Sequence, residues 1–331
     1  MARPEAKPPT PDTANSAPLP PYRACLPNEE RGIVRHTVQR YKKSVCWAGE
    51  PAIVARMAST QPHELGLIAG KGAYPLLLAD SARRAGVRRL CVLAFKGETE
   101  RRIADAATDI QWIHVGQLGR LLDAFRAWGV QHAVMAGQIT PTHLFRVRLD
   151  GAMLAVLRRL KVRNAETIFG AVGDELRAIG VDLLPAHLFM EEHMPGAGVL
   201  TSRAPTPEQE ADIRFGLRVA HTTSGLDIGQ TVVVKNGTVI AVEAFEGTDQ
   251  AILRAGRLAG PGCVVVKVAK QGHDMRFDIP VVGLHTAATL RKARVAAMAV
   301  EAGRCIVLER EAVTKELDRR GVTLVAVAAE T

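Results

Sequence analysis

Charged side chains that could do chemistry are densest between Lys267 and Pro280. This stretch holds two lysines, an arginine, a histidine and two aspartates, and the apolar segments on either side predict buried strands. Loops that join rigid strands carry functional residues disproportionately often. The cations Lys267, Lys270 and Arg276 could hold a diphosphate, while Asp278 could bind a metal ion or orient a water molecule. A salt-bridged surface loop is the alternative that the residues leave open.

A second group of polar residues, Glu246 to Asp249, follows the strongest hairpin signal in the sequence, Asn236-Gly237. Mg²⁺ prefers oxygen ligands, so Glu246 and Asp249 together with a third carboxylate such as Asp278 would suit it. The same run could instead cap a helix through Thr248 or Asp249. A ligand or metal role and a capping role therefore both stay open.

The glycine turn, Gly70-Lys71-Gly72-Ala73, follows one predicted strand and opens a predicted helix. Free backbone N–H groups at the start of a helix attract phosphate groups. The turn is not a dinucleotide fingerprint, because Pro75 stands where the third glycine is required. It is not a Walker loop either, because Gly72 replaces the Ser or Thr that binds magnesium. It predicts a loop that binds phosphate or nucleotide, with a plain tight turn as the alternative.

Two further polar positions lie where predicted strands begin or end. Gly137-Gln138 follows the fourth predicted strand, where a small residue lets a ligand approach the backbone and an amide can both donate and accept hydrogen bonds. Gln230 precedes the first strand of the predicted hairpin. Gly137-Gln138 is therefore a candidate for ligand contact.

The composition excludes several classes of protein. Hydrophobic residues make up 47% of the 331 residues and charged residues 23%, as in ordinary globular proteins. No run of about 18 apolar residues could span a membrane, and the start lacks the apolar core of a signal peptide, so we expect a cytoplasmic protein. The net charge of +9 could attract an anionic partner, but with 4% aromatic residues no nucleic-acid partner is expected. Five scattered cysteines form neither a disulfide framework nor a metal-binding spacing.

Residues 1–60 are expected to form a disordered, proline-rich and basic extension. The first 57 residues hold nine of the 18 prolines, and nine Lys+Arg against five Asp+Glu. Such a segment buries too little apolar surface to offset its chain entropy. A basic arm that contacts anionic lipid, and a chain that starts at Met57, are the alternatives.

From Glu64 onward, apolar runs and helical patterns alternate. Residues 61–195 are predicted to form a Rossmann-like α/β domain with a parallel sheet, because strands and helices of this length wind with right-handed crossovers. Residues 207–331 are predicted to form a catalytic α/β domain with a mixed sheet, in which Ala287–Ala302 is a helix, and residues 196–206 to link the two. Ligands of open α/β sheets bind outside the carboxyl ends of the strands, so we expect a ligand cleft between the domains.

Five motifs occur together and in order: LGLIAGKGAYP at 65–75, AGQ at 136–138, LDIGQ at 226–230, AVEAFEGTD at 241–249 and RFDIP at 276–280. Each alone would be weak evidence, but the set is specific. Together they resemble the LpxI-type UDP-2,3-diacylglucosamine pyrophosphatases of lipid A biosynthesis, over about residues 64–329.

The resemblance implies a magnesium-dependent hydrolase, with Mn²⁺ as a substitute ion, that cleaves UDP-2,3-diacylglucosamine to UMP and 2,3-diacylglucosamine 1-phosphate (lipid X). It implies a cytoplasmic enzyme at the periphery of the inner membrane and is compatible with a homo-oligomer. By motif, Asp278 corresponds to the family's essential aspartate, while Lys71 departs from the smaller residue of many relatives. The implied substrate-lining residues are Gly70, Lys71, Gly72, Ala73, Gly137, Gln138, Gln230, Glu246, Gly247, Thr248, Asp249 and Lys267.

Two functions from other classes fit parts of the sequence. A nicotinamide-dependent oxidoreductase fits the alternation of strands and helices, although the broken fingerprint counts against it. A non-catalytic module that binds nucleotide or anionic lipid fits the glycine turn and the positive charge. Release of UMP by the purified protein with Mg²⁺ separates the hydrolase from both.

Overall fold

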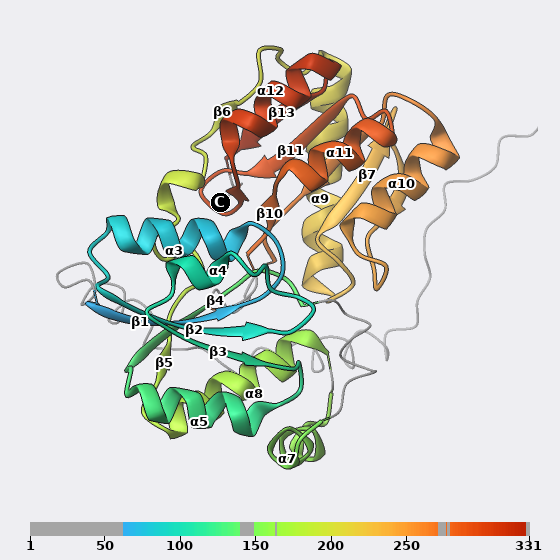
Figure 1. The fold of residues 1–331 in the computed structure, drawn as a ribbon. Helices are drawn as coiled ribbons and strands as arrows, with labels where there is room; N and C mark the ends of the chain where they lie inside the picture. Colours follow the sequence, from blue (N-terminus) through green and yellow to red (C-terminus); the bar gives the residue numbers. More distant parts are fainter. Residues whose placement is uncertain (1–61, 140–148, 163, 271–275, 277–278, 329–331) are drawn as a thin grey trace, which may run out of the picture. The chain divides into compact units, whose positions relative to one another are not determined.

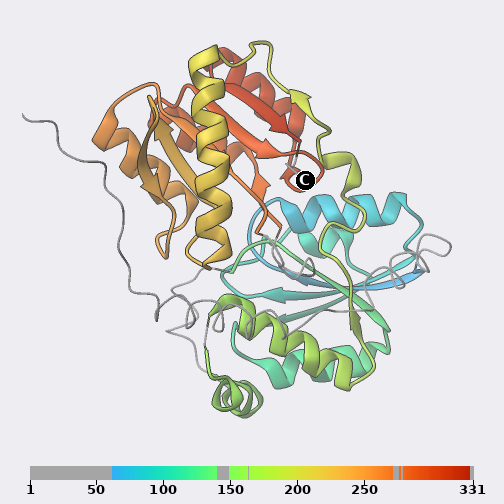
Figure 2. The same ribbon diagram turned by 180° about the vertical axis from the view of Figure 1, so that it is seen from behind.

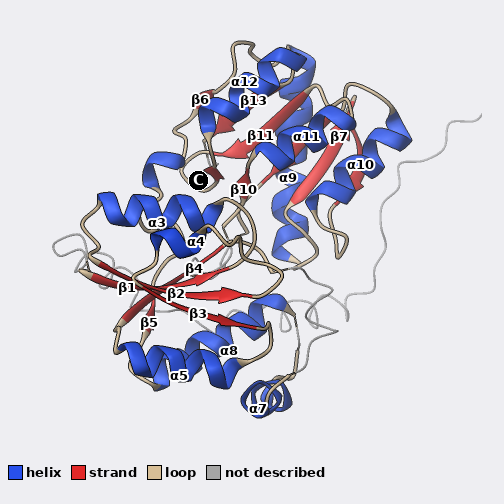
Figure 3. Cartoon of the chain, in the orientation of Figure 1, coloured by secondary structure: helices blue, strands red, loops and turns tan. Residues whose placement is uncertain are grey.

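The computed structural model describes residues 62–139, 149–162, 164–270, 276 and 279–328. All of them belong to one compact unit. The expected extension, residues 1–60, lies outside the described residues. The described chain forms two large sheets and a small one (Figures 1 and 3). Among these residues no helix is both long and apolar enough to cross a membrane.

The first sheet is wholly parallel, with the strand order β3-β2-β1-β4-β5. This order confirms the Rossmann-like parallel sheet predicted for the first domain. The strand β1 is central and apolar, as expected of a strand that is covered on both faces. The five strands are β1 (Glu64–Ala69), β2 (Arg89–Phe95), β3 (Asp109–Ile113), β4 (His132–Ala136) and β5 (Asp182–Leu183).

Helices cover both faces of the first sheet, with α3 on one face and α5 and α8 on the other (Figure 1). The side chain of Phe125, from α5, fills the space above Gly66 of β1, where an added Cβ would lie 2.4 Å from its ring. The glycine in β1 therefore lets α5 pack closely on the sheet. The helices are α3 (Tyr74–Arg84), α4 (Ile103–Ala106), α5 (Leu118–Trp128), α7 (Gly151–Arg159) and α8 (Ala165–Ala178), and a 3-10 turn, η1, spans Glu191–His193.

The second sheet is mixed, as predicted, with the order β6-β13-β11-β9-β7-β8. Its strands β9, β11 and β13 are mutually parallel, whereas β6, β7 and β8 each pair antiparallel with a neighbour. The strands are β6 (Gly198–Val199), β7 (Thr231–Lys235), β8 (Thr238–Val242), β9 (Val264–Lys267), β11 (Ala297–Glu301) and β13 (Thr323–Val327). The small sheet pairs β10 (Val281–Val282) with β12 (Ile306–Val307). Residues 196–206, expected as a linker, include β6.

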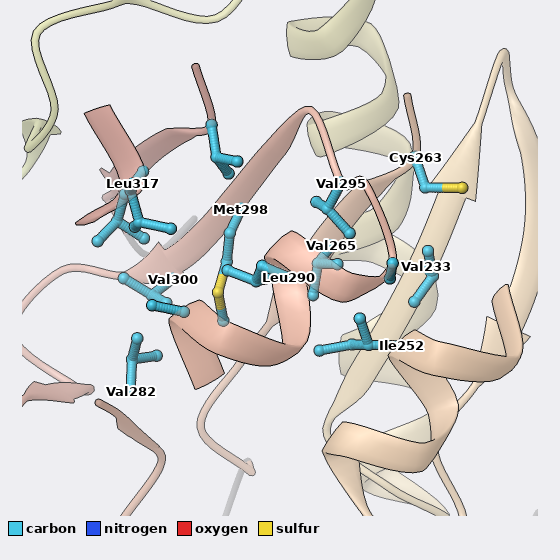
Figure 4. Close-up of a cluster of buried hydrophobic side chains, with 14 of the residues drawn as sticks. Val233, Ile252, Cys263, Val265, Val282, Leu290, Val295, Met298, Val300 and Leu317 are labelled. Atoms are coloured by element: carbon cyan, nitrogen blue, oxygen red, sulfur yellow. The ribbon is translucent and has the colours of Figure 1, made fainter. Parts of the chain in front are cut away.

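Two layers of helices sandwich the second sheet. Alternate residues of β9 divide between them: Val264 and Val266 pack with α9, whereas Val265 packs with the opposite layer (Figure 4). Both faces of this strand are therefore buried, which explains its unbroken run of valines. Figure 2 shows α9 lying across one face. The helices are α9 (Pro207–Gly225), α10 (Thr248–Ala259), α11 (Leu284–Lys292) and α12 (Arg310–Arg320).

The predicted helix over Ala287–Ala302 is wrong in its second half. The helix α11 ends at Lys292, Arg294 adopts a left-handed φ of 53°, and Ala297–Glu301 forms the parallel strand β11. The segment Ala-Met-Ala-Val is apolar at every position, so it lacks a periodicity that distinguishes helix from strand. Burial on both faces of the sheet decides for the strand, with Ala299 on the α9 face and Met298 on the other.

The predicted hairpin between β7 and β8 is confirmed. Asn236 and Gly237 form its turn with φ values of 50° and 71°, the left-handed pair that this type of hairpin requires. The buried carboxylate of Asp212, on α9, accepts hydrogen bonds from the backbone N–H groups of both residues, at 2.9 and 2.7 Å. A buried carboxylate thus fixes the turn at one edge of the second sheet.

Candidate active site

The opposite edge of the second sheet, which we call the carboxyl edge, gathers polar residues from several strands. The strand β9 ends there at Lys267, and β11 ends there at Glu301. The antiparallel strand β7 begins there, because Thr231 pairs with Lys267. Strands of an open α/β sheet present their carboxyl ends to ligands.

Four side chains at the carboxyl edge form what we call the Thr248 cluster: Thr231, Glu243, Thr248 and Lys267. The Lys267 ammonium donates to Oγ1 of Thr248 at 2.7 Å, and Thr248 in turn donates to Oε1 of Glu243 at 2.9 Å. The hydroxyl oxygen of Thr231 lies 3.3 Å from that of Thr248. Lys267 is only 5% exposed, so its charge is held in a largely water-excluded place. Buried cations of this kind act strongly on anions that come within reach.

Two acceptors, one in this cluster and one beside it, have no hydrogen-bond partner among the described residues. One is Oε2 of Glu243 and the other is Oε1 of Gln230, and both atoms are buried. Gln230 adjoins the cluster because its carbonyl oxygen accepts from the N–H of Val268, at 3.0 Å. Buried acceptors are nearly always paired in folded proteins, so each of these oxygens is suited to receive an N–H or O–H group of a ligand.

Lys270 lies in a different set of contacts. Its ammonium pairs with Oδ1 of Asp227 and lies 3.7 Å from Oε2 of Glu166. Asp227 also accepts a hydrogen bond from the side chain of Asn164, at 2.7 Å. The charge of Lys270 is therefore already neutralised by carboxylates. The Lys267 ammonium differs, because its hydrogen bond goes to a hydroxyl group.

Glu246 and Asp249 each engage a basic side chain. Glu246 pairs with Arg254 at 2.5 Å, and this hydrogen bond lowers the pKa of the Glu246 carboxyl group. Oδ2 of Asp249 lies 3.0 Å from Nε2 of His285. Between them Gly247, with a left-handed φ of 83°, forms the N-cap of α10. No three His, Cys, Asp or Glu side chains of the described residues are grouped so that they could hold a metal ion.

Of the last two catalytic candidates, only Arg276 is described, because Asp278 lies outside the described residues. A methyl group added at Gly173, on α8, would lie 3.2 Å from Nη1 of Arg276. The guanidinium group therefore packs closely against the backbone of α8. Its role and that of Asp278 stay predictions.

The glycine turn and Gly137-Gln138 meet at the carboxyl ends of β1 and β4. The N–H of Gly70 donates to the carbonyl of Ala136 at 2.7 Å, and Lys71 exchanges backbone hydrogen bonds of 2.7 and 3.2 Å with Gln138. Gly72, at a φ of 93°, faces open space, and Ala73 is the N-cap of α3. The structure thus brings both predicted loops of the first domain together.

Gly70 and Gly137 are needed for this loop contact itself. An added Cβ would lie 2.6 Å from the carbonyl oxygen of Gln138 at the first position, and 2.8 Å from that of Lys71 at the second. Real Cβ atoms do not approach backbone atoms so closely. The sequence suggested that these glycines admit a ligand, but a structural reason suffices for both.

We expect Gly137→Ala to destabilise the protein by about 2–4 kcal/mol, because it adds a backbone clash to a strained φ. The matched control is Gly86→Ala, since Gly86 has a similar φ of 102° but open space around its Cβ position. That variant should lose only about 1–2 kcal/mol. Urea unfolding followed by circular dichroism measures both. Equal losses in the two variants would contradict the close approach of the loops.

The described cysteines are not poised as nucleophiles. Burial raises the pKa of the Cys91 and Cys305 thiols to about 12 and also raises that of Cys263. A thiol needs to ionise before it attacks a substrate. The groups of the carboxyl edge that could do chemistry are therefore its lysine, hydroxyl and carboxylate groups.

The structure adds residues that we did not select from the sequence. Thr231 and Glu301 stand at strand ends, a signal that could have identified them, and Glu243 lies in the motif at 241–249 but was not chosen as a site residue. His221, whose Nε2 lies 3.4 Å from Oε1 of Glu301, lies inside a long helix pattern near its end and gave no such signal.

Two solved structures that match this chain are distant likenesses. The biotin carboxylase domain of the Hydrogenobacter thermophilus 2-oxoglutarate carboxylase matches with a TM-score of 0.23 and 13% identity, over 53% of this chain and 35% of that one. The phosphoribosylglycinamide synthetase of Anaerococcus prevotii matches with a TM-score of 0.23 and 11% identity, over 55% and 39%. The chain thus spans little more than a third of either protein.

The sequence comparisons are far stronger. A UDP-2,3-diacylglucosamine pyrophosphatase, LpxI, from Caulobacter vibrioides is 34% identical over 279 residues, which cover 80% of this chain and 98% of that protein. The model of the LpxI N-terminal domain matches residues 64–193, and the model of the LpxI C-terminal domain matches residues 196–325. The boundary between the two matched regions lies immediately before β6. This chain therefore belongs to the LpxI family.

Proposed function

We propose that this protein hydrolyses the diphosphate of UDP-2,3-diacylglucosamine and releases UMP and 2,3-diacylglucosamine 1-phosphate, a reaction of lipid A biosynthesis. The observation that carries the proposal is the 34% identity with the Caulobacter pyrophosphatase over 98% of that protein's length. The family models match both domains, so the candidate residues of both domains lie within the matched regions.

The Thr248 cluster has groups that such a reaction needs. Water attack on a diphosphate builds negative charge on the phosphoryl oxygens, and fixed donors in a water-poor site stabilise that charge. The ammonium of Lys267 has three N–H donors, of which one goes to Thr248. In this proposal the two remaining N–H donors of Lys267 bind phosphoryl oxygens, because the hydroxyl proton of Thr248 already goes to Glu243. Lys270 would first have to leave Asp227 and Glu166, so we assign the main diphosphate contact to Lys267.

Two of the unpaired acceptors at the carboxyl edge support a nucleotide-sugar ligand. Glu243 Oε2 and Gln230 Oε1 are buried and face no donor among the described residues. The hydroxyl groups of a sugar and the N–H group of uracil are donors of the kind that would satisfy them. These two residues are therefore our candidates for orienting the substrate beside Lys267.

Exposed apolar side chains near the same edge support a substrate with acyl chains. Leu226 and Ile228 lie on the loop before β7, and Phe245 lies on the loop after β8; they are 68%, 46% and 73% exposed. The loops touch, because a Cβ on Gly229 would lie 2.1 Å from the carbonyl oxygen of Glu243. We place the enzyme in the cytoplasm, in peripheral contact with the inner membrane that supplies such a lipid.

A requirement for magnesium is part of the proposal and has its own test. Mg²⁺ is usually held by one or two carboxylates together with waters and substrate phosphates, and Asp278, outside the described residues, is the candidate for such a carboxylate. We expect EDTA to abolish UMP release and Mg²⁺, or Mn²⁺, to restore it. Full activity in EDTA would contradict the metal requirement while leaving the hydrolase activity in place.

The proposed function is tested with purified full-length protein, UDP-2,3-diacylglucosamine in mixed micelles and Mg²⁺. We expect UMP release that rises in proportion to protein concentration. UDP-glucose, which has the same diphosphate but no acyl chains, is the control substrate and should release far less UMP. Absence of UMP from both substrates would contradict the proposal and favour a binding module.

A further inference from the structure

Glu301 is a buried carboxylate at the carboxyl edge that lies outside the Thr248 cluster. It is the last residue of β11 and is only 1% exposed. The neighbours Met298 and Val300 pack on the α10–α12 face, so strand alternation places Glu301 on the α9 face. A carboxylate is costly to bury unless hydrogen bonds and opposite charges compensate it.

The contacts of Glu301 point to the segment that follows β9. Its Oε2 accepts a hydrogen bond of 2.6 Å from the backbone N–H of Ala269. Its Oε1 lies 3.4 Å from Nε2 of His221 and 3.9 Å from Nη1 of Arg304. Two basic side chains thus lie near Oε1, which has no hydrogen-bond partner among the described residues, while Oε2 accepts from a backbone amide.

Ala269 lies between the two lysines that leave the end of β9. The Lys267 ammonium reaches Thr248, and the Lys270 ammonium reaches Asp227. A backbone fixed at Ala269 therefore limits the directions that both side chains can take. A charge-assisted hydrogen bond is stronger than a neutral one, which suits it to this task.

We propose that Glu301 is a positioning residue, whose carboxylate fixes Ala269 and thereby aims Lys267 at the diphosphate. This role rests on the proposed function, since it gives Lys267 a phosphate to bind. A displacement of about 1 Å at a reacting group can lower a rate about 100-fold, so the effect of losing the contact should be large.

Three variants at this position test the role. Glu301→Ala removes the acceptor, and we expect kcat for UMP release to fall by up to about 100-fold, with a smaller change in KM. Glu301→Gln keeps an acceptor for Ala269 and should recover most of kcat. Glu301→Asp keeps the charge but retracts the carboxylate by one methylene, so its kcat should also fall. This variant provides the test if Glu301→Ala does not fold.

The matched control is Asp212→Asn, because Asp212 is also a buried carboxylate that holds backbone N–H groups, but at the hairpin edge of the same sheet. It should lower the melting temperature and leave kcat of the folded protein unchanged. Wild-type kcat in folded Glu301→Asp or Glu301→Ala would overturn the positioning role. A wild-type protein that releases no UMP would instead overturn the proposed function, and the positioning role with it.

Discussion

Lys267→Met is expected to lower kcat for UMP release by about 100- to 1,000-fold while the protein stays folded, the loss typical of removing one preorganised donor. Methionine has nearly the length of lysine and suits a site that is 5% exposed, so the fold should tolerate it. The ammonium, in contrast, is the buried cation of the Thr248 cluster, and no neutral side chain replaces its charge.

The control for this variant is Lys235→Met on β7. Lys235 also ends a strand of the second sheet, but its ammonium donates to the carbonyl of Ala259, away from the carboxyl edge. We expect wild-type kcat for this control. Steady-state kinetics and melting temperatures are measured for both variants. If Lys267→Met keeps wild-type kcat, Lys267 does not bind the reacting phosphate.

Asp278→Ala is expected to lower kcat at least about 100-fold, whether the carboxylate acts as a general base or as a metal ligand. The two roles differ in what else changes. Loss of a base leaves the dependence on Mg²⁺ concentration unaltered, whereas loss of a ligand raises the Mg²⁺ concentration needed for half-maximal rate.

A surface aspartate provides the control for Asp278→Ala. Asp123, on α5, has a side chain that is 75% exposed and pairs with Arg126. Asp123→Ala should retain wild-type kcat and Mg²⁺ dependence. Substantial turnover by Asp278→Ala would remove this carboxylate from the reaction.

Much of the fold follows from local patterns. The Asn236-Gly237 pair specifies its hairpin because both residues tolerate the left-handed conformation, and Gly129 ends α5 for the same reason. The strand β11 escaped prediction because a short, uniformly apolar segment carries no period. The strand β6 has two residues, and its pairing with β13 depends on a contact more than a hundred residues away in sequence, which no local pattern contains.

Site residues could be predicted from the sequence where a polar or charged side chain lies at or near the end of a predicted strand. Thr248, Lys267 and Gln230 were all candidates from the sequence, and the structure places them at one edge. The bond between Glu301 and Ala269 joins positions 32 residues apart, through the pairing of β9 with β11. It could not be predicted without that strand, because the register of the sheet creates the contact.

The most direct test is to identify the products of a single turnover by mass spectrometry. Wild-type protein is mixed, in the presence of Mg²⁺, with a smaller amount of UDP-2,3-diacylglucosamine. We expect UMP and 2,3-diacylglucosamine 1-phosphate in equal amounts, because water cleaves the P–O–P linkage and leaves one phosphate on each product. UDP with free diacylglucosamine, or unchanged substrate, would contradict hydrolysis of the diphosphate by this protein.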